Sequence, residues 1–166
     1  MVELPQPYRH CLIFPILSAL FILSMFYRVS NAVIAPNLIQ DLGLNAETLG
    51  ILGGAFFYSF ALLQIPIGPM LDRIGPRLVI TSFPLIGAIG AFLFAAGQSY
   101  TTTTALLGRI LIGAGMSCVL MGSFKVFTLR FPLNMFATLS GTILSIGTIG
   151  SILAASPLAF LIFIRG

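Results

Sequence analysis

The chain reads GPMLDRIGPR from Gly68 to Arg77, between two long apolar segments. Gly75 and Pro76 favour a tight turn in a very short loop. Arg73 and Arg77 are cations, which collect in the cytoplasmic loops of membrane proteins. The stretch therefore predicts two membrane-spanning helices that are joined by a short cytoplasmic turn.

Three further apolar segments flank this pair along the chain. Each of the five is long enough to cross about 30 Å of hydrocarbon as a helix. The runs are continuous, whereas the strands of a membrane β-barrel alternate in polarity. The predicted fold is an all-α, polytopic membrane helix bundle, with a cytoplasmic N-terminus (1–10) and one five-helix transmembrane domain (11–164). The expected spans are residues 11–35, 49–71, 78–96, 103–126 and 137–164.

The composition favours the same fold class. Of the 166 residues, 58% are hydrophobic and only 7% are charged, whereas a soluble domain carries about 25% charged residues. The net charge of +4 does not indicate a nucleic-acid partner, because the basic residues stand singly at helix ends. Cys11 and Cys118 lie in apolar runs without the spacing of metal ligands. We therefore expect no nucleic acid, no metal site and no cofactor.

The charges of the loops predict the orientation in the membrane. Lys and Arg occur in the loops 71–77 and 125–133, whereas the loop 36–48 carries Asp41 and Glu47 and no cation. Because Lys and Arg mark the cytoplasmic side, the N-terminus is expected inside. The very short loops favour a bacterial cytoplasmic (inner) membrane.

The stretch that begins at Gly68 resembles a signature of the major facilitator superfamily, found in the cytoplasmic loop between helices two and three. That signature is a Gly, three residues, Asp-Arg, one residue, a Gly, one residue and a basic residue. Leu78 stands where the family has a second basic residue. The matching positions are Gly68, Asp72, Arg73, Gly75 and Arg77.

The resemblance implies that the chain forms the first five helices of the family's N-terminal half. In the family, this loop cluster holds the two halves of the transporter together in the outward-facing state. The residue types suit that role. Gly68 lets another helix approach closely, and Asp72 can face the positive N-terminal end of another helix.

Two arginines fall inside the expected spans. A charge at mid-membrane costs at least about 2.5–3.5 kcal/mol, so such a side chain usually faces a cavity or a partner. Arg28 is expected in the outer half of the first span and Arg109 in the outer third of the fourth, at similar depth. The alternative for each is a side chain that reaches out to the interface.

The resemblance implies that helices one and four line the central cavity. Arg109, followed by Gly113 and Gly115, also resembles the family's fourth-helix motif. Tyr27 either lines the same cavity or is an interfacial aromatic residue. Helical spacing places Ser24 and Asn31 on the face of Arg28, and Ser117 on the face of Arg109. The expected substrate-cavity residues are Ser24, Tyr27, Arg28, Asn31, Arg109 and Ser117.

These features predict a secondary active transporter and not an enzyme, since no acid–base or metal constellation is visible. Two intramembrane cations without an intramembrane carboxylate favour a small anionic organic substrate. Family members carry substrate between two six-helix halves, so we expect an incomplete or truncated form. The alternatives are a truncated or frameshifted product, a fragment, or a piece whose missing helices a second polypeptide supplies. The alternative is a non-transporting membrane protein that packs against another membrane protein as an assembly or regulatory partner.

Overall fold

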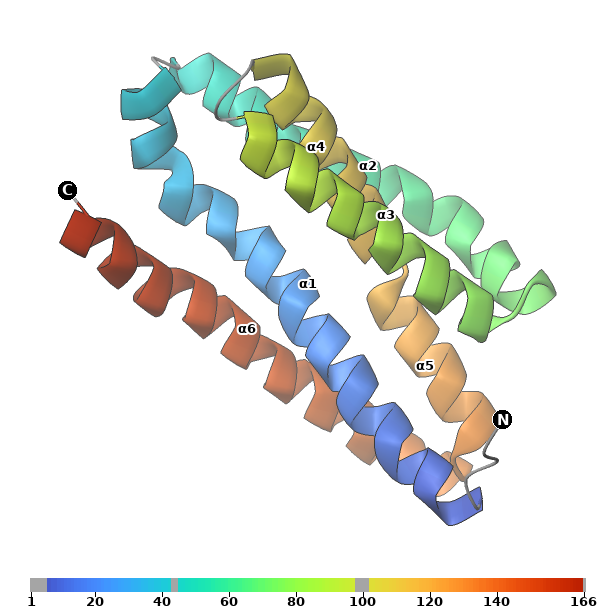
Figure 1. The fold of residues 1–166 in the computed structure, drawn as a ribbon. Helices are drawn as coiled ribbons and strands as arrows, with labels where there is room; N and C mark the ends of the chain where they lie inside the picture. Colours follow the sequence, from blue (N-terminus) through green and yellow to red (C-terminus); the bar gives the residue numbers. More distant parts are fainter. Residues whose placement is uncertain (1–5, 43–44, 98–101, 166) are drawn as a thin grey trace.

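The computed structural model describes residues 6–42, 45–97 and 102–165, and their side chains within 12–30, 33, 45, 47–96 and 102–155. These residues form helices and short turns, without strands. The elements are α1 (Gln6–Leu42), α2 (Ala46–Arg73), α3 (Pro76–Gly97), α4 (Thr102–Met116), α5 (Val119–Arg130), the 3-10 helix η1 (Leu133–Met135) and α6 (Phe136–Arg165). Figure 1 shows that the helices run roughly side by side along the length of the bundle.

The all-α membrane bundle predicted from the sequence is confirmed, because five segments are long and apolar enough to cross a membrane. The chain is thus an integral membrane protein. The five segments are Leu12–Ser30, Glu47–Arg73, Pro76–Ala96, Thr102–Arg130 and Leu133–Ala155.

The fourth of these segments is interrupted, although the expected span 103–126 is a continuous apolar run. α4 ends at Met116 and α5 begins at Val119. At the break, the Ser117 backbone N–H and hydroxyl both donate to the carbonyl oxygen of Ala114, at 3.4 and 2.6 Å. These bonds to a residue three positions earlier compete with the α-helical pattern, and Gly and Ser residues commonly kink helices.

Individual residues explain where α2 begins and how the turn between α2 and α3 is formed. The side chain of Asn45 caps α2 by accepting a hydrogen bond from the backbone N–H of Thr48 at 2.9 Å. Gly75 has a φ of +93°, which glycine adopts without strain. Pro76 is then the first residue of α3, where its missing N–H is not needed. Arg73 and Arg77 are exposed on either side of this turn.

Glycines bring α3 and α4 into backbone contact. A Cβ atom on Gly115 would collide with the backbone of Gly87, and one on Gly90 would collide with the backbone of α4 at Gly108. Small residues allow such close approach between membrane helices. On another face of α4, Gly113 meets the backbone of Phe56 on α2. α4 is therefore enclosed by two helices.

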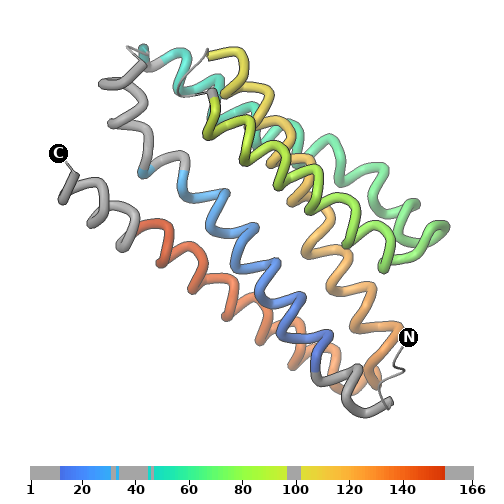
Figure 2. The backbone as a smooth tube through the Cα atoms, in the orientation of Figure 1, coloured from blue at the N-terminus to red at the C-terminus, as the bar shows by residue number. Residues whose placement is uncertain are grey.

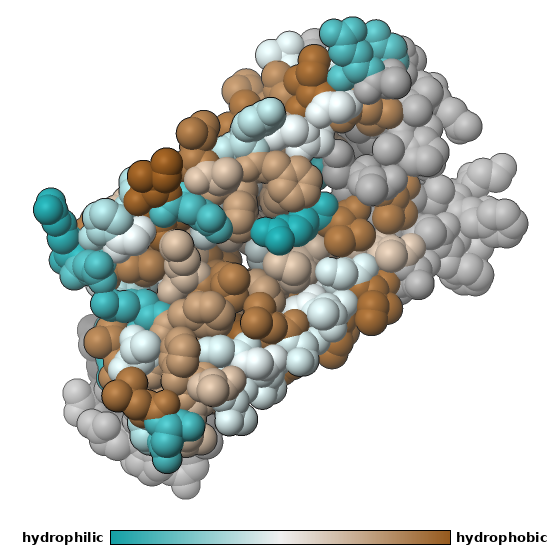
Figure 3. Space-filling view, turned by 180° about the vertical axis from the view of Figure 1, so that it is seen from behind, coloured by the Kyte–Doolittle hydropathy of each residue, from teal (hydrophilic) through white to brown (hydrophobic). Residues whose placement is uncertain are grey.

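α6 packs in the same way along α1, where Gly147 lies against the ring of Phe21 and Gly150 against the backbone of Ile22. The bundle thus has two packing units, α1–α6 and α2–α3–α4, and α5 contacts members of both (Figure 2). Apolar side chains cover much of the outer surface (Figure 3). Ile65 and Phe92, each 77% exposed, are examples of side chains that lipid would cover.

Candidate functional site

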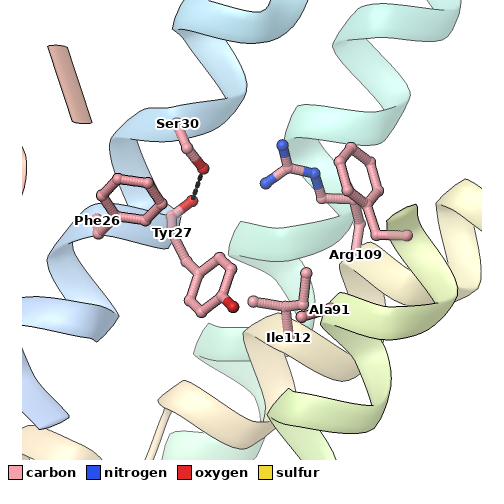
Figure 4. Close-up of a pocket in the computed structure, with 7 residues that line it drawn as sticks. Phe26, Tyr27, Ser30, Ala91, Arg109 and Ile112 are labelled. Carbon is pink, nitrogen blue, oxygen red and sulfur yellow. Dashed lines mark hydrogen bonds between the residues drawn. The ribbon is translucent and has the colours of Figure 1, made fainter. Parts of the chain in front are cut away.

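A cavity of about 190 Å³ lies where α1 of one packing unit faces α3 and α4 of the other. Most of its wall is aromatic or aliphatic, and Figure 4 shows how the side chains surround it. The lining residues are Phe26, Tyr27, Ser30, Ala91, Phe94, Arg109 and Ile112.

Arg109 supplies the positive charge of this cavity. Its side chain is only 1% exposed, and its guanidinium extends from α4 toward α1 (Figure 4). The guanidinium carbon lies 4.4 Å from the ring centroid of Phe94, within the range of a cation–π interaction. The cation is thus placed between an aromatic ring on one helix and the cavity.

The neighbouring Gly108 explains how Phe94 reaches this position. A Cβ atom on Gly108 would collide with the backbone of Phe94 and with the carbonyl oxygen of Gly90. The absence of that side chain lets α3 approach α4 closely at this level. The close approach brings the Phe94 ring against the guanidinium of Arg109.

α1 forms the opposite wall through Phe26, Tyr27 and Ser30. The hydroxyl of Ser30 donates a hydrogen bond to the backbone carbonyl of Tyr27 at 3.2 Å. The Ser30 proton is therefore used within the helix, although the hydroxyl oxygen can still accept. The Tyr27 ring also lies edge-on to that of Phe26, with centroids 6.0 Å apart.

Arg28 lies elsewhere, although it follows Tyr27 directly. It is half-buried, and its guanidinium carbon sits 4.9 Å from the ring centroid of Phe60 on α2. Its Nε atom is buried and makes no hydrogen bond to the residues that the structure describes. Successive residues of a helix point about 100° apart, so neighbours on α1 face different surroundings.

The other expected cavity residues are spread over the bundle. Ser24 is buried in α1 without lining the cavity, and Ser117 is buried at the break between α4 and α5. The side chain of Asn31 lies outside the described residues. Of the expected set, the cavity brings together Tyr27 and Arg109.

The sequence reasoning did not single out the remaining lining residues. Helical spacing carried a signal for two of them, since Ser30 follows Tyr27 by three positions and Ile112 follows Arg109 by three. Phe94 gave no such signal, because it comes from α3 and reaches the site only through helix packing.

The loop motif forms an ion pair that the sequence reasoning also missed. Lys125 Nζ on α5 donates to Asp72 Oδ1 on α2 at 2.7 Å. Both side chains are accessible, at 36% for Lys125 and 65% for Asp72. They lie in a groove of about 410 Å³ that also includes Gly68. A Cβ atom on Gly68 would meet no other atom within 4 Å, so this side of α2 is open.

Among the described residues, no three His, Cys, Asp or Glu side chains cluster closely enough to hold a metal ion. The thiol of Cys118 is buried and lies 3.8 Å from the backbone oxygen of Val79. That contact ties the break in the fourth span to α3.

Comparisons with known proteins agree with this architecture. Residues 16–165 match the family model described as Major Facilitator Superfamily. The chain is 30% identical to the "Uncharacterized transporter YybO" of Bacillus subtilis over 89% of this chain and 33% of that protein. It is 28% identical to the "Probable sulfoacetate transporter SauU" of Cupriavidus necator, over 81% and 33% of the two chains.

A third relative is the "4-hydroxybenzoate transporter PcaK" of Pseudomonas putida, which is 35% identical over 72% of this chain and 27% of its own length. The chain thus spans about a third of the length of the curated relatives it matches. No solved structure matches the chain significantly.

Proposed function

Because the chain belongs to the major facilitator superfamily, we propose that it forms the substrate-binding N-terminal part of a secondary transporter for a small organic anion. Two relatives carry the names of organic-anion transporters, for sulfoacetate and for 4-hydroxybenzoate. The family assignment points to a transporter and away from an enzyme.

The observation that carries the proposal is the position of Arg109. This cation is almost fully buried in the fourth span and lines a cavity between two packing units. A charge within the membrane is costly, and where it persists it usually marks a substrate or ion pathway. An anionic group that accepts hydrogen bonds from the guanidinium would offset that cost.

The rest of the cavity can support such a ligand. The Tyr27 hydroxyl can donate or accept a hydrogen bond, and the Ser30 oxygen can accept one. Both come from α1, which faces Arg109 across the cavity (Figure 4). A bound anion would thus touch both packing units. Transporters of this family carry substrate between two six-helix halves, and both packing units belong to the one half that this chain resembles.

We further propose that the N-terminus lies in the cytoplasm of a bacterial cell. Arg73, Arg77, Lys125 and Arg130 lie where α2 meets α3 and α5 meets α6, which Figure 1 shows at one end of the bundle. Glu47 lies in the first turn of α2, at the other end. The positive-inside rule makes the cationic end cytoplasmic, and the relatives named above are bacterial.

Ligand binding to the purified chain in lipid nanodiscs tests the anion proposal. The panel contains sulfoacetate, 4-hydroxybenzoate and the neutral analogue 4-hydroxybenzamide. We expect saturable binding of at least one anion, with the amide at least about tenfold weaker, because it lacks the charge that Arg109 recognises. Equal binding of the acid and its amide, or no binding of any anion, would overturn the proposal.

A second candidate function is that of a packing partner for another membrane protein. It is favoured by open small-residue positions, since Cβ atoms on Gly50, Gly68 and Gly141 would meet no atom within 4 Å. Gly141→Trp would block such a face on α6 and leave the cavity intact. This candidate would be favoured over the transporter if Gly141→Trp abolished a crosslinked complex in native membranes and the unchanged chain bound no anion.

A further inference from the structure

We propose that the cavity selects a flat apolar ring that carries a single anionic group, a benzoate-type monoanion, over a polyhydroxylated organic acid. This inference rests on the proposed function, because it takes the ligand to be an organic anion bound at Arg109. It narrows the substrate class from the chemistry of the cavity wall.

The wall offers few hydrogen-bond partners. Phe26, Phe94 and Ile112 present only apolar surface, and the Ser30 proton is bonded to the backbone of its own helix. Beyond the Tyr27 hydroxyl and the Ser30 oxygen, a ligand with several hydroxyl groups would find few replacements here for its bonds to water. Polar groups that are buried without a partner cost more affinity than unfilled apolar contacts.

The charge pattern of the wall fits one negative group. Arg109 is the cation among the described lining residues, whereas Arg28 lies against Phe60 on α2 and does not line the cavity. The guanidinium carbon of Arg109 lies 4.4 Å from the ring centroid of Phe94, beside the cavity. A guanidinium can bind both oxygens of one carboxylate or sulfonate.

The aromatic side chains of α1 provide the place for the ligand's ring. Phe26 and Tyr27 lie edge-to-face on the wall opposite α3 and α4. Aromatic rings pair favourably in offset or edge-on arrangements. The cavity of about 190 Å³ is smaller than drug-sized sites of about 300–1,000 Å³, so one small ring suits it better than a larger scaffold.

The test measures binding of labelled benzoate and labelled tartrate to the full chain in nanodiscs, with benzamide as the neutral competitor. We expect benzoate to bind at least about tenfold more tightly than tartrate, because unpaired hydroxyls penalise the latter. Tartrate that binds as tightly as benzoate overturns the selectivity and leaves the organic-anion transporter in place. Benzamide that competes as well as benzoate, or the absence of all binding, overturns both.

Phe94 provides the matched substitution. Phe94→Leu removes the ring under Arg109, and we expect it to weaken benzoate binding by about threefold or more. Phe94→Tyr keeps the aromatic ring, so we expect it to bind benzoate about as tightly as the unchanged chain does. A role for side-chain size alone would not require an aromatic ring. Phe92→Leu is the control, since Phe92 lies on the same helix and is 77% exposed. Thermal unfolding checks that both variants are folded. If they are, equal binding of benzoate by Phe94→Leu and Phe92→Leu would refute the role of the Phe94 ring.

Discussion

Arg28 and Arg109 are alike in sequence context and different in surroundings. Each falls inside a membrane span, and each lies against a phenylalanine ring of a neighbouring helix. Arg109 is almost fully buried and lines the cavity, whereas Arg28 is half-buried and does not. The depth in the membrane that the sequence predicts for a charged residue therefore does not decide how exposed its side chain is.

The packing of the two helices explains the difference. α4 carries glycines on two faces, so that α3 closes on it at Gly108 and α2 closes on it at Gly113. α1 is packed closely by α6 and contacts α2 and α4 only lightly. A cation on α4 is consequently enclosed by neighbouring helices, and one on α1 keeps access to its surroundings.

The largest expected effect separates the two arginines by function. Arg109→Gln should weaken organic-anion binding by about 10- to 100-fold, since hydrogen bonds to charged groups contribute about 1.5–3 kcal/mol. Arg28→Gln should change it by less than about threefold, as expected for a substitution outside the site. Equilibrium binding in nanodiscs measures both variants.

Arg109→Lys serves as a control for charge alone, because lysine keeps the positive charge and loses the planar fork. We expect intermediate affinity. If Arg28→Gln weakens binding as much as Arg109→Gln, the two arginines act at one site and the contrast drawn from their burial is wrong.

The second prediction tests the packing that encloses Arg109. Gly108→Ala places a methyl group against the backbone of Phe94 and should lower the free energy of unfolding by about 1–3 kcal/mol, as overpacking does. Gly50→Ala adds the same methyl group to α2, where no atom lies within 4 Å. Unfolding by SDS titration in mixed micelles compares the two variants. Equal stability of both would mean that α3 and α4 can separate without cost.

Sequence reasoning was strongest where one segment carried all the information. The helical class follows from apolar length, and it is confirmed by five helical segments that are long and apolar enough to cross a membrane. The turn at Gly75 could likewise be predicted from neighbouring residues. Gly75, with its φ of +93°, and the following Pro76 both lie within the stretch from Gly68 to Arg77. The break near Ser117 is less visible, since a continuous apolar run conceals a local change in hydrogen bonding.

Contacts between distant segments could not be predicted in this way. Phe94 reaches Arg109 because glycines on two helices meet, and no pattern within either helix specifies that partner. Lys125 was expected in the loop 125–133, whereas the structure has it within α5, where it pairs with Asp72, 53 positions earlier in the chain. The role of the cavity residues in substrate binding stays a prediction that the variants above can test.

The third prediction compares the two cation–π contacts directly. Double-mutant cycles would combine Arg109→Met with Phe94→Leu, and Arg28→Met with Phe60→Leu. We expect a coupling of about 2 kcal/mol for the buried pair and about 0.5–1 kcal/mol for the half-buried one, because desolvation strengthens the attraction. The measurement is the free energy of unfolding in mixed micelles. A larger coupling for the Arg28 pair would reverse the contrast.

The smallest expected effect concerns the ion pair between Asp72 and Lys125, which links α2 to α5. Both side chains are accessible, so water and salt screen their attraction, and a coupling of about 0.2–1 kcal/mol is expected. A cycle of Asp72→Asn and Lys125→Gln, measured at low and at high salt, should lose most of its coupling energy at high salt. A coupling that is unchanged by salt would require the pair to be shielded from solvent. The ion pair would then resemble the buried site at Arg109 and not the exposed end of the bundle.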